Sequence, residues 1–312
     1  MITKRINQIL MKRTRQAVGM TLLILTTLPL GGVQAQQDPI FTYYLQNPIA
    51  FNPAVAGTAS GLNLSLLTRH QWVGLEGAPT SYSFGAHSPY VKDLMGLGFH
   101  FMTDQVGQQR NTHVTGSYAY QIQVVEGMRL SMGLRAGVSN YRAATGTMRV
   151  NDPTDPHFLS DLNRTAPNLG VGFFLFTANY YIGFSTPRLF EPRLNREYRN
   201  SSEPYNPQLF LKGGYDFLLN REWRLKPSLL VGAMGGSPVL VNITAQAQYM
   251  ERIIFGTHYR IGDALGVFVN GMVNENLGIG YAYSFSLSRL STVNGSIHEF
   301  VIIYSLKNIW QF

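Results

Sequence analysis

The chain has 312 residues and no cysteine, which excludes structural disulfides, thiolate metal sites and a lipid anchor on cysteine. Charged residues make up 13% of it, about half the usual globular share. The formal charge of +8 includes five basic residues and no acidic one in residues 1–35, so the remainder carries only +3 and indicates no nucleic-acid partner.

Residues 1–35 have the pattern of a secretory signal peptide. A basic stretch precedes apolar residues 17–30, which are too few to span a membrane. Val33-Gln34-Ala35 offers the small residues that a signal peptidase requires, so the mature chain is expected to begin near Gln36. The alternatives are a short N-terminal membrane anchor and a translation start at Met11.

Residues 36–60 are expected to form an irregular N-terminal segment or plug. Two Asn-Pro pairs, Asn47-Pro48 and Asn52-Pro53, lie there among aromatic and aliphatic residues. Asn-Pro favours turns, and proline drives the residue before it out of the helical region. A folded but non-helical segment is therefore predicted ahead of residues 61–312.

Beyond residue 60, apolar and polar residues alternate in one segment after another. The clearest is residues 128–141, where Leu130 and Met132 oppose Arg129 and Ser131. Alternation with period 2 predicts strands with one apolar and one polar face. The candidate strands are residues 62–72, 81–86, 95–102, 112–124, 128–141, 168–177, 180–185, 208–218, 223–233, 239–249, 252–261, 265–273, 277–286 and 296–306.

These segments predict an all-β fold, a transmembrane antiparallel β-barrel of about 14 strands in the cell outer membrane. Most of these segments have about 8 to 14 residues, which fits a tilted bilayer crossing, whereas strands of soluble proteins average about five or six. The long connections, residues 142–167, 187–207 and 287–295, all follow odd-numbered strands, which is typical of outer-membrane barrels. The alternative is a soluble exported β-sandwich or adhesin.

The sequence shows no recognisable catalytic, phosphate-binding, cofactor or metal motif. His100, His113 and His258 fall on the polar face of predicted strands, as expected for a polar lumen. Basic residues on that face suit an anion-preferring or peptide-binding interior, or equally a packed, salt-bridged one: Arg69, Arg129, Arg135, Lys212, Arg224, Lys226 and Arg260. Residues 148–163 hold carboxylates of the kind that bind calcium and residues 188–199 are basic enough for a partner contact, although plain solvated loops explain both.

Three stretches early in the mature chain carry specific motifs: YYLQNPIAFNPAVAG (43–57), RHQWVGLEGAPTSYSFGAHSP (69–89) and GLGFHFMTDQVGQQ (96–109). They resemble the PorP/SprF family of the Bacteroidota type IX secretion system, whose pattern joins N-P…N-P-A-x-A-G, R-x-Q-W-x-G-x-x-G-A-P and a G-L-G strand ending in D-x-x-G. The matching positions are Asn47, Pro48, Asn52, Pro53, Ala54, Ala56, Gly57, Arg69, Gln71, Trp72, Gly74, Gly77, Ala78, Pro79, Asp104 and Gly107. A late match at Gly295, Ser296, His298 and Glu299 is interrupted by Ile297.

The resemblance implies a non-enzymatic outer-membrane component that acts in the export or surface attachment of proteins with C-terminal sorting domains. The implied partners are outer-membrane lipids, the PorK/PorN ring, PorM, a peptidoglycan-binding lipoprotein and the exported cargo. The alternatives are a general porin or small-molecule channel, a cargo-specific adhesin partner like SprF, and an outer-membrane enzyme. A structural or partner-contact patch near the periplasmic rim is expected from Asn47, Pro48, Asn52, Pro53, Arg69, Trp72 and Pro79.

Overall fold

The computed structural model describes residues 39–144, 161–189, 207–287 and 295–307. Among these residues, no helix is both long enough and apolar enough to cross a membrane. Residues 236–238 belong to a separate compact unit and are a short turn in which Gly236 has a φ of 76°. All other described residues belong to one unit, which is a single antiparallel sheet with a segment folded against it.

The strands follow one another along the chain with two short 3-10 helices ahead of them. The helices are η1 (Pro48–Ala50) and η2 (Pro53–Val55). The strands are β1 (Gly61–Gln71), β2 (Thr80–Val91), β3 (Met95–Val106), β4 (Gln109–Val125), β5 (Met128–Ala143), β6 (Leu162–Phe176), β7 (Tyr180–Thr186), β8 (Leu209–Tyr215), β9 (Phe217–Leu218), β10 (Trp223–Ala233), β11 (Leu240–Tyr249), β12 (Ile253–Arg260), β13 (Ala264–Met272), β14 (Leu277–Ser286) and β15 (Ser296–Lys307).

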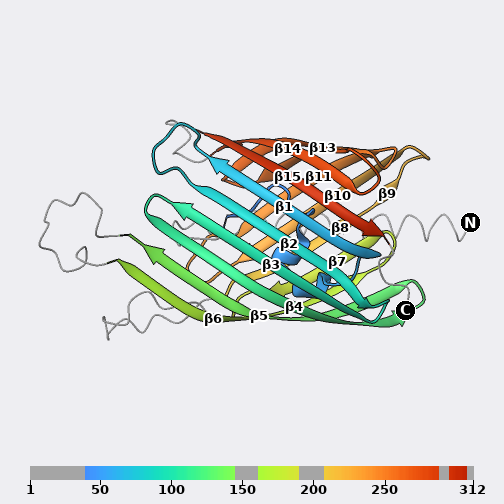
Figure 1. Ribbon diagram of the computed structural model, residues 1–312. Coiled ribbons are helices and arrows are strands. Elements are labelled where there is room, and N and C mark those ends of the chain that lie inside the picture. Colours follow the sequence, from blue (N-terminus) through green and yellow to red (C-terminus); the bar gives the residue numbers. More distant parts are fainter. Residues whose placement is uncertain (1–38, 145–160, 190–206, 288–294, 308–312) are drawn as a thin grey trace, which may run out of the picture. The chain divides into compact units, whose positions relative to one another are not determined.

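The sheet closes on itself, so the predicted antiparallel β-barrel is confirmed (Figure 1). Consecutive strands pair along the chain, β15 pairs with β1, and β10 pairs with β11. The short β8 and β9 flank Asp216 and both pair with β10, so they are two parts of one strand. Counted in this way, the barrel has 14 strands.

Along the strands, the outward side chains are mainly apolar and the inward ones mainly polar, apart from inward apolar residues such as Leu67 and Phe268 that pack with the N-terminal residues. In β4, Thr115 and Gln121 are buried, whereas Tyr118 and Tyr120 between them are about two-fifths exposed. Such a surface suits lipid, because an apolar outer band and a polar interior are the pattern of membrane barrels. The histidines His100, His113 and His258 are all buried on the inward face, as predicted.

Strand positions agree closely with the alternation, and β10 and β14 have the predicted bounds. The connection between β5 and β6 is shorter than the predicted residues 142–167, because β6 already begins at Leu162 and Asn163 pairs with Arg142. Pro167, which the prediction placed at the end of this connection, lies within β6 although proline cannot donate to a ladder. It is exposed opposite Val138, and the pairing continues on both sides of it.

The two ends of the barrel differ in their connections. One end, here called the short-turn rim, carries the connections at residues 92–94, 126–127, 177–179, 219–222, 250–252 and 273–276. The other, the long-loop rim, carries the connections at residues 72–79, 144–161, 187–208 and 287–295. This rim also carries short connections at residues 107–108 and 261–263, so the long connections all lie at one rim, but not every connection there is long. The possible calcium and partner loops lie outside the described residues, apart from positions 161–163 and 188–189.

Candidate functional site

Residues 39–60, here called the inner segment, lie inside the barrel (Figure 1). Its large side chains have almost no exposed surface: Tyr43, Tyr44 and Ile49 are all 0% exposed. The segment begins beside Asp263 at the long-loop rim and ends at Gly61, where β1 starts at the short-turn rim. It therefore crosses the lumen from one rim to the other before the barrel begins.

The two Asn-Pro pairs fold the inner segment into consecutive tight turns. Pro48 and Pro53 each begin a 3-10 helix, a position where the missing N–H and the fixed φ of proline cost nothing. Asn52 caps η2, because its side-chain oxygen accepts a hydrogen bond from the Ala54 N–H at 2.9 Å. These turns make the segment compact enough to fill the lumen.

Both asparagines also reach across to the barrel wall. The amide of Asn47 donates to the Ser83 hydroxyl on β2 at 2.9 Å. The amide of Asn52 donates to the Phe173 carbonyl on β6 at 3.0 Å. Since neither amide is exposed to solvent, these hydrogen bonds fix the turns against two separate parts of the wall.

The wall comes closest to the inner segment where it carries glycine. A Cβ added to Gly133 on β5 would lie 2.2 Å from the Ala54 nitrogen, and one on Gly172 would lie 2.0 Å from the Asn52 side-chain oxygen. No other residue fits at such distances without moving the backbone or the asparagine. The inward-facing glycines therefore form a seat for η2.

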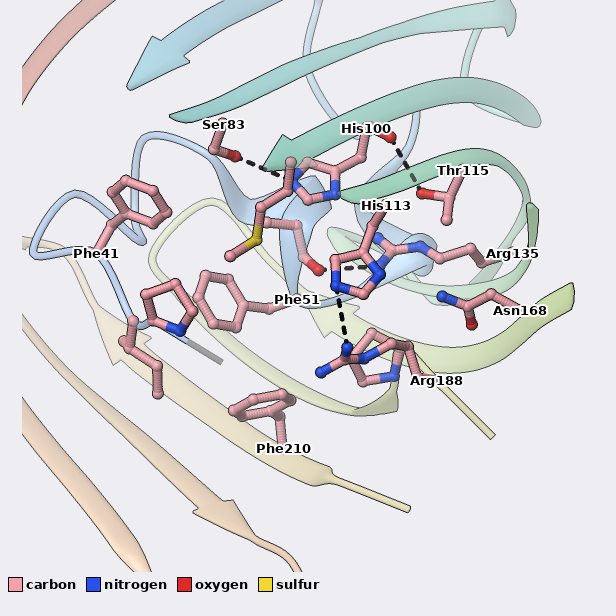
Figure 2. A pocket seen from close by; sticks show the side chains of 15 residues that line it. Phe41, Phe51, Ser83, His100, His113, Thr115, Arg135, Asn168, Arg188 and Phe210 are labelled. Atoms are coloured by element: carbon pink, nitrogen blue, oxygen red, sulfur yellow. Dashed lines mark hydrogen bonds between the residues drawn. The ribbon is translucent and has the colours of Figure 1, made fainter. Parts of the chain in front are cut away.

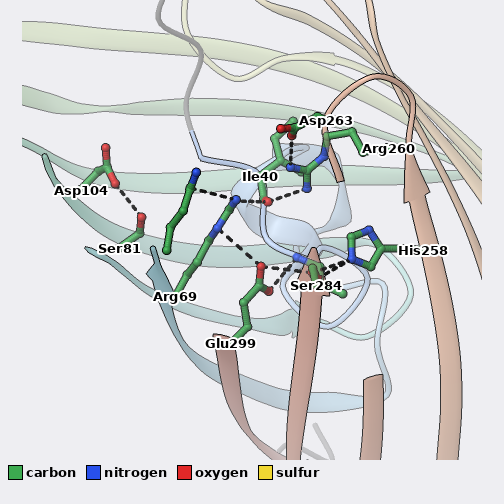
Figure 3. Close-up of polar contacts among 11 residues, drawn as sticks. Ile40, Arg69, Ser81, Asp104, His258, Arg260, Asp263, Ser284 and Glu299 are labelled. Atoms are coloured by element: carbon green, nitrogen blue, oxygen red, sulfur yellow. Dashed lines mark hydrogen bonds and ion pairs between the residues drawn. The ribbon is translucent and has the colours of Figure 1, made fainter. Parts of the chain in front are cut away.

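Charged side chains hold the start of the inner segment at the long-loop rim (Figure 3). The carbonyl of Ile40 accepts hydrogen bonds from Arg69 at 2.6 Å and from Arg260 at 2.8 Å. Glu299 lies 3.7 Å from Arg69, and Asp263 lies 2.7 Å from Arg260. Because Arg69 and Glu299 are almost fully buried, losing either one would leave an uncompensated charge in the interior.

A third buried guanidinium holds the middle of the segment (Figure 2). Arg135 on β5 donates to the Ala50 carbonyl at 2.9 Å and also to the Ile49 carbonyl. Ser185 on β7 donates to the Phe51 carbonyl at 2.9 Å. These donors satisfy carbonyls at the end of η1 that would otherwise be buried without partners.

Two tyrosines secure the segment against the strands on the opposite side. Tyr43 donates to the Val269 carbonyl at 3.0 Å, and its ring packs edge-on against Phe268. The Tyr44 hydroxyl lies 3.0 Å from the Ser228 hydroxyl. Burial raises the pKa of both tyrosines, so both hydroxyls remain neutral hydrogen-bonding groups.

The inner segment divides the lumen into separate cavities. On the long-loop side, a cavity of about 50 Å³ is lined by Phe51, Arg135 and Phe210, whose side chains Figure 2 shows. A neighbouring cavity of about 240 Å³ lies beside Arg69 and Arg260. On the short-turn side there is a cavity of about 520 Å³. In the part of the chain that the structure describes, no cluster of metal-ligating side chains occurs.

The structure divides the seven predicted site residues into two groups. Asn47, Pro48, Asn52 and Pro53 belong to the inner segment. Arg69, Trp72 and Pro79 lie toward the long-loop rim, because β1 runs from one rim to the other. There the backbone N–H of Trp72 donates to the Ser296 carbonyl at 2.8 Å, and the Pro79 carbonyl accepts from the backbone N–H of Gln71 at 3.0 Å.

Sequence reasoning placed Arg69, Arg135 and Arg260 on the inward face but did not find what they bind. All three donate to carbonyls of the inner segment. The alternation of the strands identified their direction, whereas their partners are far away along the chain. The sequence identified Glu299 only as part of a late motif. In the structure its carboxylate contacts both Arg69 and the Thr42 N–H at the long-loop end of the inner segment.

Residues 33–304 match the family described as type IX secretion system membrane protein PorP/SprF. The chain belongs to the PorP/SprF family. The family and the outer-membrane barrel fold are both non-enzymatic in kind, and both support a location in the outer membrane. The motif residues of this PorP/SprF protein thus prove to be those that fold the inner segment and fix it to the wall, together with the hairpin between β1 and β2.

Several solved outer-membrane proteins are similar in structure. The CymD monoaromatic hydrocarbon channel is 10% identical, with 82% of this chain and 92% of that chain covered and a TM-score of 0.48. The Ralstonia pickettii toluene transporter TbuX is 14% identical over 82% and 92%, with a TM-score of 0.47. Acinetobacter baumannii Omp33 is 4% identical over 80% and 100%, with a TM-score of 0.46. These likenesses concern architecture alone. No curated protein matches the sequence.

Proposed function

We propose that this protein acts, without enzymatic activity, in the export or surface attachment of proteins with C-terminal sorting domains by the type IX secretion system. Family membership supports a role in that system. The observation that carries the proposal is the inner segment, which fills the lumen and is held by buried ions at Arg69, Arg260 and Glu299. A barrel with its lumen filled in this way is suited to being a scaffold or docking partner.

In this proposal the short-turn rim faces the periplasm and the long-loop rim faces outward, as is usual for outer-membrane barrels. Residues 1–35 direct export and are removed near Gln36. The PorK/PorN ring, PorM and a peptidoglycan-binding lipoprotein are then the periplasmic partners. Trp72 and Pro79 would contribute to contacts at the opposite, long-loop rim, while the Asn-Pro pairs act through the inner segment.

Deletion of the gene tests the proposal by comparing extracellular with periplasmic proteins. Accumulation of the whole class of sorting-domain cargo inside the cell identifies a core part of the exporter. Loss of a single adhesin from the surface identifies a cargo-specific partner like SprF. Unchanged export and attachment would refute the proposed role.

A small-molecule channel is the second candidate, because cavities of about 240 and 520 Å³ lie on the two sides of the inner segment. The channel would require the segment to move, since Ile49 and Tyr44 of that segment are fully buried inside the barrel. Planar bilayer recordings decide between the candidates. Large, stable conductance from the unmodified protein favours the channel, and its absence favours the scaffold.

A further inference from the structure

The cavity on the short-turn side of the inner segment, here called the short-turn vestibule, has the dimensions of a ligand site. Its volume of about 520 Å³ falls in the range of small-molecule pockets. Leu45 and Gln46 of the inner segment line one side, and inward-facing residues of β7, β8 and β10 line another. It extends to the β6–β7 turn, where Asn179 is exposed. Ligands therefore have access from the short-turn rim.

Lys212 on β8 brings a side-chain amine without a carboxylate partner among the described residues into this vestibule. Its ammonium nitrogen lies 5.1 Å from the centre of the Tyr44 ring and 5.6 Å from that of Tyr181. No carboxylate of the described residues forms an ion pair with it. Ring faces attract a cation but leave its hydrogen-bond donors available. The ammonium can therefore donate hydrogen bonds to an anionic partner.

Lys226 lies in the same vestibule and provides the contrast. Its ammonium lies 3.4 Å from Asp216, which also contacts Arg224 at 3.3 Å. The only carboxylate among the described lining residues is thus already shared by two cations. An incoming anion would find its complement at Lys212.

The remaining lining indicates which kind of anion fits. Tyr181 adds aromatic surface next to the ammonium, Phe174 and Tyr215 add aromatic surface elsewhere in the lining, and Ile254 adds an aliphatic side chain. A single ammonium neutralises a single negative charge, whereas phosphate groups are preferentially held by several donors, often from arginine. The combination favours a carboxylate joined to an apolar body.

We propose that the short-turn vestibule binds a carboxylate ligand with an apolar body, its carboxylate paired with Lys212 and its apolar part packed on Tyr181 and Phe174. The same chemistry occurs in the free carboxyl end of a peptide and in a small aromatic acid. The site goes beyond the secretion role and rests on it only for the compartment, the periplasm, from which the ligand arrives.

Calorimetric titration of the full chain in detergent tests the site with matched probes. One pair is the peptide Gly-Ser-Leu-Phe with a free carboxyl end and the same peptide amidated; the other is 3-phenylpropionate and its amide. We expect at least one acid to bind ten or more times tighter than its amide. Peptide binding alone identifies a chain end as the ligand source, and binding of 3-phenylpropionate identifies a small acid.

Two matched lysine variants locate the charge. Lys212→Met removes the ammonium and should abolish the difference between acid and amide. Lys226→Met should retain it, because that ammonium is already compensated, and Lys212→Arg should retain it through the conserved charge. Heat-dependent migration on gels establishes that each variant is folded.

The proposal is overturned if the unmodified protein binds acid and amide equally, or binds no probe at 1 mM. It is also overturned if the two Met variants lose the preference to the same degree. Neither result would alter the export phenotype of the deletion strain, so failure of this site is distinguishable from failure of the secretion role.

Discussion

Glu299 accepts two hydrogen bonds from Thr42, one from the backbone N–H at 2.7 Å and one from the hydroxyl at 3.1 Å, across a separation of 257 residues. Glu299 belongs to the last strand, β15, which closes the barrel by pairing with β1. Thr42 belongs to the inner segment. This contact between the inner segment and the barrel wall therefore requires that the first and last strands have paired.

Replacing this carboxylate tests how strongly the segment is held. Glu299→Gln leaves Arg69 buried without its counter-ion, and breaking a buried pair in this way should lower the free energy of unfolding by about 3 kcal/mol. Glu126→Gln, in an exposed turn, is the matched control and should change it by less than about 0.5 kcal/mol. Urea unfolding in lipid vesicles measures both. Equal shifts for the two variants would contradict the ion cluster's role.

A methyl group on the barrel wall should displace the inner segment directly. The Cβ of Gly133→Ala would lie 2.2 Å from the Ala54 nitrogen, so we expect a loss of about 2 kcal/mol of stability and a higher single-channel conductance. Gly116→Ala on the neighbouring strand is the control, because its Cβ meets no atom closer than 4.0 Å. Unchanged conductance in Gly133→Ala would show that the segment does not obstruct the lumen.

The barrel was largely predictable because its signal is local. In residues 128–141 each side chain's direction follows from its neighbours, and the same alternation placed Arg135 and Arg260 on the inward face. The interruption at Asp216, which divides one predicted strand into β8 and β9, carries no such signal.

The contacts that hold the inner segment were not predictable, because they join residues that are far apart in the sequence. The Asn-Pro pairs indicated turns, but their partners Ser83 and Phe173 are far away in sequence. A polar inward face is equally compatible with lumen water and with a buried segment, so the alternation could not distinguish an open barrel from a filled one. Only the pairing of the strands brings Glu299 to Thr42.

A substitution in the Asn-Pro motif should lower stability, whereas one in the β1–β2 hairpin should reduce export. Asn52→Ala removes a helix cap and the hydrogen bond to the Phe173 carbonyl, and should cost about 2 kcal/mol of stability. Trp72→Ala, at the long-loop rim, should leave the urea midpoint near that of the unmodified protein but reduce export of sorting-domain cargo. If the double variant retained both barrel assembly and export, neither residue would have its proposed role.

Single-cysteine variants test the orientation of the barrel in the membrane. Because the chain contains no cysteine, only the introduced residue can be labelled. Glu76 lies in the β1–β2 hairpin at the long-loop rim and Glu126 in the β4–β5 turn at the short-turn rim, and both are exposed. A membrane-impermeant maleimide should label Glu76→Cys in intact cells, because long loops of such barrels face outward. It should label Glu126→Cys only after the outer membrane is permeabilised, and heat-dependent gel migration provides the control for folding. The reverse pattern would place the short-turn vestibule at the cell surface and remove the proposed periplasmic docking.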